Sequence, residues 1–569
     1  MRAGRTHLGL LALIGSTLLS ACAPSAQTPG GGAGSAPANP QRTLVMALRS
    51  EPPSVASLPL RAAGLSVASA VRLFNAELDY VDDREQTHPY LAEELPKLNT
   101  DSWKVFPDGR METTYRLKPN LTWQDGVPLS ANDFAFARRV YGTPEFLTSA
   151  ARPLSLTTEV LAPDPRTVVI RWRQPYPDAD SLKNTFQALP RHILEQPYAA
   201  DDPDAFAAEP FWGGSYIGLG PYKVEHWEPG ASIDGVAFAG HVLGRPKIER
   251  VRVVFMGDPN VVVAGLLAGS LTAAVDNSLN SDQAAVVERE WNARGGAGVV
   301  LYVPSQFRAT EVQFRPEYAN PPEVLDVRVR QAMLHAMDRK ALNDTLIAGK
   351  GILADSPISP TEPYYSTIES RIRKYPFDMR RTEQLLTEAG LTKGTDGFFN
   401  RPNGERFRPE LWCLAGGNND LEIQIQVDGF RNAGIEVTSK ILPFALFPDT
   451  KTRSTFPAFS NSSSQTFVML HGAPPGPQNQ FLGGGGRMGW ANSEFDGLLD
   501  TSQSTLDHSE WIKLQGEMAR VVSEDLPLLP IYFNVRVTAY GADLQGPLLG
   551  TTPTSGSDSW NVYQWEWRS

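Results

Sequence analysis

The chain has 569 residues and a formal net charge of −11. Its length exceeds that of one compact domain and fits roughly two or three lobes. The acidic balance argues against nucleic acid as a partner. The 48 Gly and 46 Pro residues are spread along the chain and indicate many loops and interrupted strands.

The first 22 residues have the pattern of a secretory signal. Arg2 and Arg5 precede an apolar run over Leu8–Leu19, which is shorter than the stretch of about 20 residues that spans a bilayer. The ending Leu-Ser-Ala-Cys resembles a bacterial lipobox, so we expect residues 1–21 to be a signal peptide and Cys22 to carry lipid. The alternative is an ordinary signal peptide in which Cys22 is incidental.

The segment that follows has the composition of a tether. It is nearly all Ala, Gly, Pro and Ser and cannot bury a core, which predicts a lipid-anchored flexible linker over residues 22–41. If Cys22 is acylated, Cys413 is alone and no disulfide can form, so the fold depends on its hydrophobic core. We expect the protein in the periplasm or at the outer face of the cytoplasmic membrane.

Ordered structure is expected from Arg42 onward. Residues 42–48 suit a buried strand, and residues 113–118 alternate as a half-buried strand does. Ser130 and Asp133 form a predicted capping box that begins a helix. Further expected elements are strands at residues 250–256, 299–303, 311–315 and 528–540, and helices that begin at Asp326, Asp338 and Asp378.

Residues 409–442 predict a βαβ unit. The order is a strand at Glu410–Leu414, a helix at Leu421–Asn432 and a strand at Ile435–Leu442. Such a unit requires parallel pairing with helices packed on a sheet, which predicts an α/β fold.

Several short motifs occur in a fixed order along the chain. They are Pro89–Pro96 (PYLAEELP), Tyr115–Asp133 (YRLKPNLTWQDGVPLSAND), Gly218–Tyr222 (GLGPY), Leu266–Ser270 (LLAGS), Asp326–Ala332 (DVRVRQA) and Leu385–Gly390 (LLTEAG). Together they resemble the family 5 extracellular solute-binding proteins, the oligopeptide, dipeptide and nickel type that serves bacterial ABC importers.

The resemblance implies a two-lobed periplasmic-binding-protein fold of type II, with an extra inserted domain and a hinge between the lobes. The implied boundaries are residues 42–85, 211–308 and 526–569 for the first lobe, 86–210 for its inserted domain and 309–525 for the second lobe. It also implies a monomer that captures a peptide or peptide-like solute and delivers it to ABC permease subunits. No cofactor, no enzymatic activity and no membrane contact beyond the lipid are expected.

The second lobe departs from the peptide-binding pattern. The resemblance implies an acidic residue, after a strand expected at Thr466–Leu470, that meets a ligand ammonium. Thr450–Ser493 contains no Asp or Glu, and its charges are Lys451, Arg453 and Arg487. Either a neutral or anionic ligand group is met here, so that acetylating a peptide weakens binding little, or the acid comes from elsewhere, for example from Glu51.

Candidate ligand contacts follow from the rule that ligands of α/β sheets meet the loops at the carboxyl ends of strands. Trp490 follows a Gly-rich loop and could stack on a ligand. The candidates are Arg49, Ser50, Glu51, Gly416, Asn418, His471, Gln478, Gln480 and Trp490.

Other functional classes find little support. Gly213–Ile217 does not complete a nucleophile elbow, and no zinc-protease or Walker motif occurs. Gly484–Gly489 fits the dinucleotide pattern but follows no clear strand. The eight His are scattered, so a protein-built metal site is not expected. Open alternatives are an oligosaccharide, an anionic metabolite or a nickel chelate as ligand, with His471 as contact for the chelate, or a signalling or structural lipoprotein.

Overall fold

The structure is a computed structural model that describes residues 42–60, 68–146, 153–182, 186–463, 466–472, 486–550 and 557–568. The chain divides into two units, residues 1–41 and residues 42–569, and the description below concerns the second. The predicted signal peptide, the linker, Cys22, Gln478 and Gln480 lie outside the described residues.

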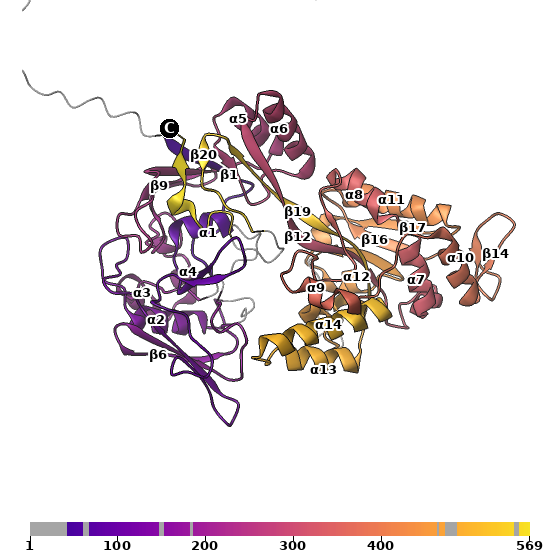
Figure 1. The fold of residues 1–569 in the computed structure, drawn as a ribbon, viewed down its shortest axis with the longest axis horizontal. Coiled ribbons are helices and arrows are strands. Elements are labelled where there is room, and N and C mark those ends of the chain that lie inside the picture. The colour runs from indigo at the N-terminus through magenta and orange to yellow at the C-terminus, as the bar shows by residue number, and fades with distance from the viewer. Residues whose placement is uncertain are drawn as a thin grey trace, which may run out of the picture. The chain divides into compact units, whose positions relative to one another are not determined.

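In this part of the chain the largest sheet has 11 strands (Figure 1). Its order is β17 (Thr438–Leu442), β16 (Glu410–Leu414), β18 (Phe459–Ser463), β12 (Gly298–Val312), β19 (Leu528–Gly541), β11 (Ala273–Ala274), β1 (Thr43–Leu48), β10 (Arg250–Phe255), β9 (Ser232–Ala237) and β8 (Tyr222–Glu228), with β13 (Ile352–Leu353) also paired to β19. A second sheet has the order β4 (Trp103–Val105), β5 (Met111–Arg116), β7 (Thr167–Trp172) and β6 (Thr157–Asp164). The two-stranded pairs are β2 (Asp79–Val81) with β3 (Thr87–Pro89), β14 (Thr392–Lys393) with β15 (Phe399–Asn400), and β20 (Leu544–Gln545) with β21 (Glu566–Trp567).

Along the chain, the helices alternate with these strands. They are α1 (Ala68–Phe74), α2 (Ala131–Tyr141), α3 (Arg191–Ala199), α4 (Pro203–Ala207), α5 (Pro259–Ala268), α6 (Ser281–Ala293), α7 (Val327–His335), α8 (Arg339–Ile347), α9 (Tyr365–Ile368), α10 (Met379–Glu388), α11 (Asn419–Asn432), α12 (Thr450–Ser454), α13 (Ser493–Ser502) and α14 (His508–Asp525).

The long antiparallel pair β12 and β19 joins the two ends of the large sheet. The pairing runs from Gly298 opposite Gly541 to Glu311 opposite Leu528, with a shift in register between Pro304 and Phe307. The strand expected at residues 299–303 and the first two residues of the strand expected at 311–315 therefore belong to one strand, and residues 313–315 lie outside it. A β-bulge of this kind bends the strand and leaves backbone groups out of the ladder.

Several predicted elements are confirmed. The strand β1 and the parallel pairing of β16 with β17 around α11 match the expectations. Asp326, Asp338 and Asp378 each accept a hydrogen bond from a backbone amide at the start of the following helix. Short polar side chains at this position satisfy amides that have no partner inside the helix.

The prediction of a strand at Thr466–Leu470 is wrong. Phe467–Leu470 is a 3₁₀ helix, and the strand of this region is β18. Phe467 and Leu470 are buried, whereas Val468 and Met469 are 57% and 47% exposed. This three-residue period matches a 3₁₀ helix, and a five-residue apolar run cannot distinguish it from a strand.

The Gly218–Tyr222 motif is a packing motif. A Cβ atom at Gly220 would lie 2.3 Å from the backbone nitrogen of Asn75, so only glycine fits. The Gln124 side chain accepts a hydrogen bond from the Gly218 amide and donates to the Tyr222 carbonyl, at 3.0 and 2.7 Å. The motif therefore holds α1, β8 and the turn around Gln124 together.

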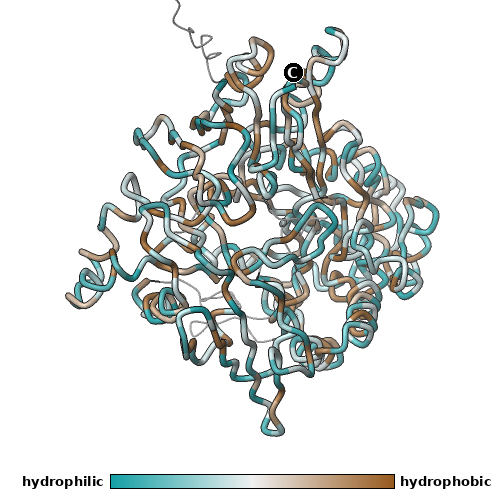
Figure 2. Tube along the Cα trace, turned by 60° about the vertical axis from the view of Figure 1, so that its left-hand side comes forward, coloured by the Kyte–Doolittle hydropathy of each residue, from teal (hydrophilic) through white to brown (hydrophobic). Residues whose placement is uncertain are grey.

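Buried apolar side chains form separate clusters. One runs from Leu44 to Val275 and includes the C-terminal Trp565, and two others lie between Phe307 and Phe533. Figure 2 shows hydrophobic and hydrophilic residues interleaved along the chain, and no helix in the described ranges is long and apolar enough to span a bilayer.

Candidate functional site

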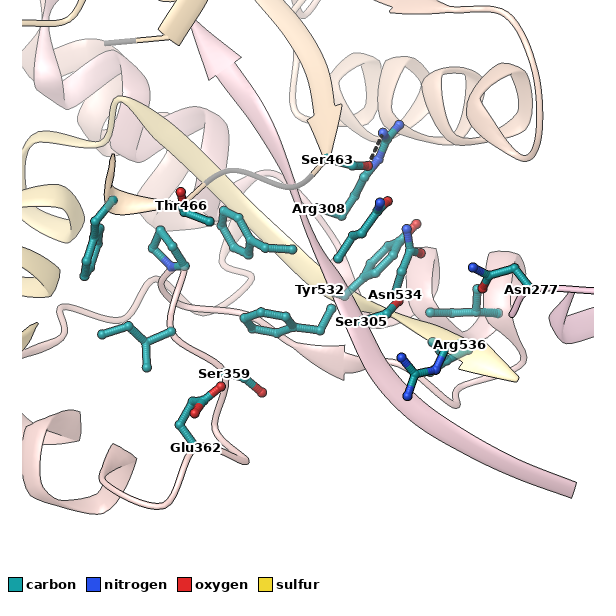
Figure 3. A pocket seen from close by; sticks show the side chains of 18 of the residues that line it. Asn277, Ser305, Arg308, Ser359, Glu362, Ser463, Thr466, Tyr532, Asn534 and Arg536 are labelled. Atoms are coloured by element: carbon teal, nitrogen blue, oxygen red, sulfur yellow. Dashed lines mark hydrogen bonds between the residues drawn. The ribbon is translucent and has the colours of Figure 1, made fainter. Parts of the chain in front are cut away.

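A cavity of about 1120 Å³ lies beside the β12–β19 pair (Figure 3). Its lining comes from segments far apart in the sequence, from Arg49 after β1 to Arg536 on β19. The bulge residues Ser305 and Gln306, opposite Asn534, also line it. The volume exceeds that of most drug-sized ligand pockets, which span about 300–1,000 Å³.

One end of the cavity is polar. Asn277 and Ser278 follow the short strand β11, and both line the cavity together with Arg536, which Figure 3 shows on the same side of the pocket as Asn277. Ser278 is 2% exposed, and its Oγ has no hydrogen-bond partner among the described residues. Asp276 and Asn277 have φ values of +49° and +59°, a left-handed conformation that Asp and Asn tolerate better than most residues.

The polar end also holds charged side chains, of which Asp558 is buried and Asp276 and Arg536 are half-buried. Arg536 lies 2.8 Å from the Asp558 carboxylate, which accepts a hydrogen bond from Thr538 at 2.6 Å. Asp276 accepts hydrogen bonds from the backbone amide and the hydroxyl of Ser69, both at 3.0 Å. Burial, together with the nearby Asp558 carboxylate, raises the pKa of Asp276 to about 7.

The other end is aromatic. Phe307 and Phe533 pack with ring centroids 5.5 Å apart, and Tyr364 meets Trp511 edge to face at 5.2 Å. Phe467 also lines this wall. Such a surface stabilises an apolar group of a ligand by burial and ring contact.

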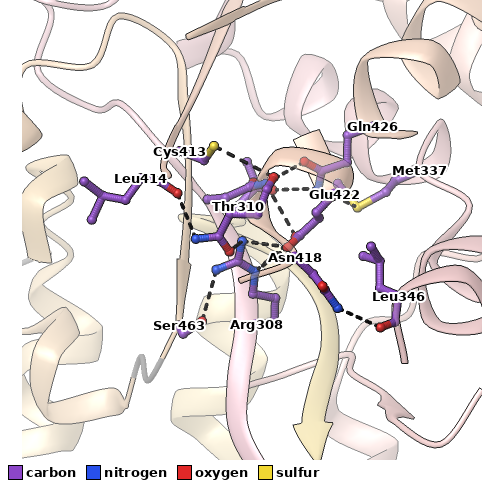
Figure 4. Close-up of polar contacts among 12 residues, drawn as sticks. Arg308, Thr310, Met337, Leu346, Cys413, Leu414, Asn418, Glu422, Gln426 and Ser463 are labelled. Carbon is purple, nitrogen blue, oxygen red and sulfur yellow. Dashed lines mark hydrogen bonds and ion pairs between the residues drawn. The ribbon is translucent and has the colours of Figure 1, made fainter. Parts of the chain in front are cut away.

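The floor of the cavity is a buried hydrogen-bond network (Figure 4). Arg308 on β12 pairs with Glu422 on α11 at 2.6 Å, and their side chains are 6% and 2% exposed. The Arg308 guanidinium also donates to Ser463 and Asn419, at 3.1 and 2.9 Å. Asn461 donates to Gln426 at 2.7 Å, so the network joins β12, β18 and α11.

The structure brings some predicted contacts together. Arg49, Ser50 and Asn418 line the cavity. Gly416 is not among its described lining residues, although the neighbouring Gly417 is. The Asn418 side chain also donates to the Leu346 carbonyl at 2.8 Å, which fixes its orientation.

Other predicted contacts lie elsewhere. Glu51 accepts hydrogen bonds from the Trp227 indole and the Gly230 amide, at 2.7 and 2.9 Å, and is not among the described lining residues. Trp490 is 1% exposed and donates to Asp525, so it packs in the core. His471 lies 3.5 Å from the Asp500 carboxylate, away from the described lining.

The basic residues of the acid-free stretch have structural partners. Arg487 pairs with the fully buried Glu311 at 2.9 Å. Arg453 donates to the Phe447 carbonyl at 2.6 Å, and burial lowers its pKa to about 10. Neither residue is among the described residues that line the cavity.

Sequence reasoning missed Asp276, Ser278 and the aromatic wall. The available signal was the polar Asp276–Ser278 run directly after the apolar β11 segment, at the carboxyl end of a strand. The aromatic residues carried no local signal because each comes from a different segment.

The described residues hold no cluster of three or more His, Cys, Asp or Glu side chains that could bind a metal ion. No histidine is among the described residues that line the cavity. The described lining offers amides, hydroxyls, charged groups and aromatic rings as possible contacts for a solute.

The chain is similar to curated proteins that are described as peptide-binding. A putative ABC transporter peptide-binding protein of Brucella ovis is 28% identical over 299 residues, which are 51% of each chain. The chain thus spans about half the length of the Brucella relatives that it matches. Oligopeptide-binding protein AppA of Bacillus subtilis is 23% identical over 501 residues, 83% of this chain and 86% of that protein.

Solved structures share the fold. NikZ of Campylobacter jejuni, in complex with Ni(L-His), has a TM-score of 0.68 at 22% identity and covers 93% of this chain and 100% of its own. AppA of Bacillus subtilis, in complex with a nonapeptide, has a TM-score of 0.69 at 19% identity, covering 93% and 99%. NikA of Brucella suis, in complex with Fe(III)-EDTA, reaches 0.73 at 16% identity, covering 93% and 100%. These likenesses confirm the expected α/β, two-lobed binding-protein fold.

The family match covers the middle of the chain. Residues 93–473 match the family described as bacterial extracellular solute-binding proteins, family 5 Middle. Because this match spans more than half of the chain and agrees with the motifs, the chain belongs to the bacterial extracellular solute-binding proteins of family 5.

Proposed function

We propose that this protein is the lipid-anchored, extracytoplasmic solute receptor of an ABC importer. It captures a peptide or peptide-like solute and delivers it to the permease. The observation that carries this proposal is the cavity of about 1120 Å³ with a polar and an aromatic end, which suits a solute with both kinds of group. The names of the Brucella and Bacillus relatives support a peptide ligand.

We further propose that the cavity lies between two lobes and that a hinge lies near residues 308 and 525. Residue 308 lies in the irregular part of β12, and residue 525 ends α14, shortly before β19 begins at Leu528. The proposed lobes are residues 42–308 with 526–569, including the inserted domain at 86–210, and residues 309–525.

Binding is tested by native mass spectrometry of the full-length protein purified gently in detergent. Release of peptide-like masses on unfolding supports the proposal. Release of a sugar, an acidic metabolite or a metal chelate contradicts the peptide assignment.

Incubation with peptides should leave them intact, and turnover that follows the protein through further purification would show that it is an enzyme.

The anchor is tested by Cys22→Ser. The lipobox-like ending and the linker composition support acylation of Cys22. The variant should leave the membrane fraction and appear among soluble extracytoplasmic proteins. Retention on the membrane at the level of the unchanged protein would contradict the lipid anchor.

A further inference from the structure

Three side chains connect the two proposed lobes beside the β12–β19 pair. Glu288 on α6 belongs to the first proposed lobe, and Lys350, in the turn between α8 and β13, belongs to the second. The Lys350 ammonium lies 3.2 Å from the Glu288 carboxylate. Tyr302 on β12 contacts both, because its hydroxyl donates to Glu288 at 3.1 Å and its ring centroid lies 4.4 Å from the Lys350 nitrogen. These three side chains form one connected cluster, the interlobe link.

The turn that carries Lys350 is fixed to β19. Gly349, with a φ of +71°, lets the chain turn away after α8. The Asn343 side chain accepts a hydrogen bond from the Gly351 amide and donates one to the Gly351 carbonyl, both at 3.0 Å. A Cβ atom at Gly351 would lie 2.9 Å from the Phe533 carbonyl oxygen, so the turn lies directly against the backbone of β19.

Glu288 and Tyr302 are fixed to another part of the same strand pair. The helix α6 packs Val287 into a buried cluster that also contains Val537 of β19. Tyr302 stands opposite Val537 in the regular part of the β12–β19 ladder. Glu288 and Tyr302 therefore move together with this part of the sheet.

The interlobe link spans the irregular part of the β12–β19 pair. Tyr302 lies before the shift in register of β12, which occurs between Pro304 and Phe307. Lys350 is attached beyond it, because β13 begins two residues later and pairs with Phe533, the partner of Phe307. A bulge bends and twists its strand, so a change of angle here changes the distance between the two charged side chains of the link.

We propose that the interlobe link is a restraint that sets the angle at the bulge and thereby the balance between more open and more closed forms of the protein. The inference rests on the proposed lobes and hinge. It assigns control of their movement to side chains that are not among the described residues that line the cavity. The bulge residues Ser305 and Gln306 do line it, so the same angle also positions part of the cavity wall.

The exposure of the link suits a restraint that can break and form again. The side chains of Lys350 and Glu288 are 36% and 35% exposed, so the ion pair is only partly screened by water. Burial, together with the Glu288 carboxylate, raises the pKa of Tyr302, so its hydroxyl stays protonated and donates. A half-exposed ion pair and a cation–π contact together change an equilibrium constant by about 5-fold.

The test measures the distance between the proposed lobes without any solute, by double electron–electron resonance on the full-length protein in detergent. In a Cys413→Ala background, spin labels are attached at Val105→Cys in the proposed inserted domain and at Leu421→Cys on α11, positions that are 41% and 49% exposed. Lys350→Met should broaden the distance distribution or change the ratio of its populations by about 5-fold. Lys350→Arg keeps the charge and should keep the distribution.

Glu288→Gln should have the same effect as Lys350→Met. The matched control is Lys340→Met, because Lys340 pairs with Asp344 within α8 alone, and this variant should leave the distribution unchanged. An unchanged distribution in Lys350→Met or in Glu288→Gln, or an equal change in Lys340→Met, would overturn the restraint. No solute takes part in this measurement, so failure of peptides to bind would contradict the proposed function and leave the result for the link intact.

Discussion

Arg308 serves two purposes at once, because it lines the cavity and is also part of the buried network. Its side chain is 6% exposed, and its charge is balanced by Glu422 at 2.6 Å. A buried ion pair contributes little net stability compared with apolar residues, yet removal of one partner leaves an uncompensated charge. The pair therefore fixes the positions of β12 and α11 at the cavity floor.

Glu422→Gln should lower the free energy of unfolding by about 3–5 kcal/mol, because Arg308 then stays buried without its carboxylate. Urea denaturation measures this change. The matched control is Glu94→Gln, which disrupts an exposed pair with Lys97 and should cost less than about 1 kcal/mol. Similar losses of unfolding free energy in the two variants would show that burial of Arg308 without its carboxylate partner carries no extra cost.

His241 predicts an acid sensitivity of the fold. It is 4% exposed, its ring contacts the Tyr90 hydroxyl at 2.8 Å and the Gly244 carbonyl at 2.8 Å, and burial lowers its pKa to about 4. The unfolded chain, with a His pKa of about 6.5, binds a proton more readily. Stability from this site is therefore complete above pH 6.5 and is lost as the pH falls towards 4.

The size of this contribution is at most about 3 kcal/mol, since each pKa unit corresponds to about 1.4 kcal/mol. His241→Gln should flatten the fall in unfolding free energy between pH 6.5 and 4, measured by urea denaturation at several pH values. The exposed His226→Gln serves as the control and should keep the slope of the unchanged protein. A parallel slope in His241→Gln would contradict the prediction.

At the scale of elements, Asp133 connects the beginnings of two helices. Its Oδ2 accepts from the Ser130 amide at 2.8 Å, which forms the predicted capping box of α2, and its Oδ1 accepts from the Arg191 amide at 3.0 Å, where α3 begins. One carboxylate thus satisfies donors from segments almost 60 residues apart.

Asp133→Ala should destabilise the protein by about 2 kcal/mol, because both amides lose an ionised acceptor. Ser130→Ala should cost about 1 kcal/mol or less, since it leaves the Arg191 contact intact. Thermal unfolding of the two variants gives the comparison. Equal shifts of the midpoint would mean that the contact to α3 contributes nothing.

These caps also show what the sequence can predict. Asp326, Asp338 and Asp378 precede their helices directly, so local spacing was sufficient to place them. The Phe467–Leu470 segment has no such neighbours, and its 3₁₀ form depends on contacts such as that of Phe467 with Phe495. Cavity residues such as Phe307 and Tyr364 meet only after folding, which no local pattern records.

At the scale of the whole molecule, the proposed lobes should close on a solute. The β12–β19 pair with its bulge at Pro304–Phe307 is the proposed hinge, and ligand binding favours the closed population of such a hinge. Small-angle scattering with and without a peptide that binds should show a smaller radius of gyration at saturation. An unchanged radius at full occupancy would contradict closure.

The place of β19 in the large sheet has a consequence for biosynthesis. It lies between β12 and β11. The segment that follows β19 also contacts an early part of the chain, because the Ser559 hydroxyl donates a hydrogen bond to the Ser69 carbonyl at 2.7 Å. β11 and β12 therefore obtain this partner strand only when the last part of the chain has been made, a delay on the order of tens of seconds during synthesis. The proposed export would then act on a chain whose large sheet is still incomplete, and such a chain can pass through a secretion channel before it folds.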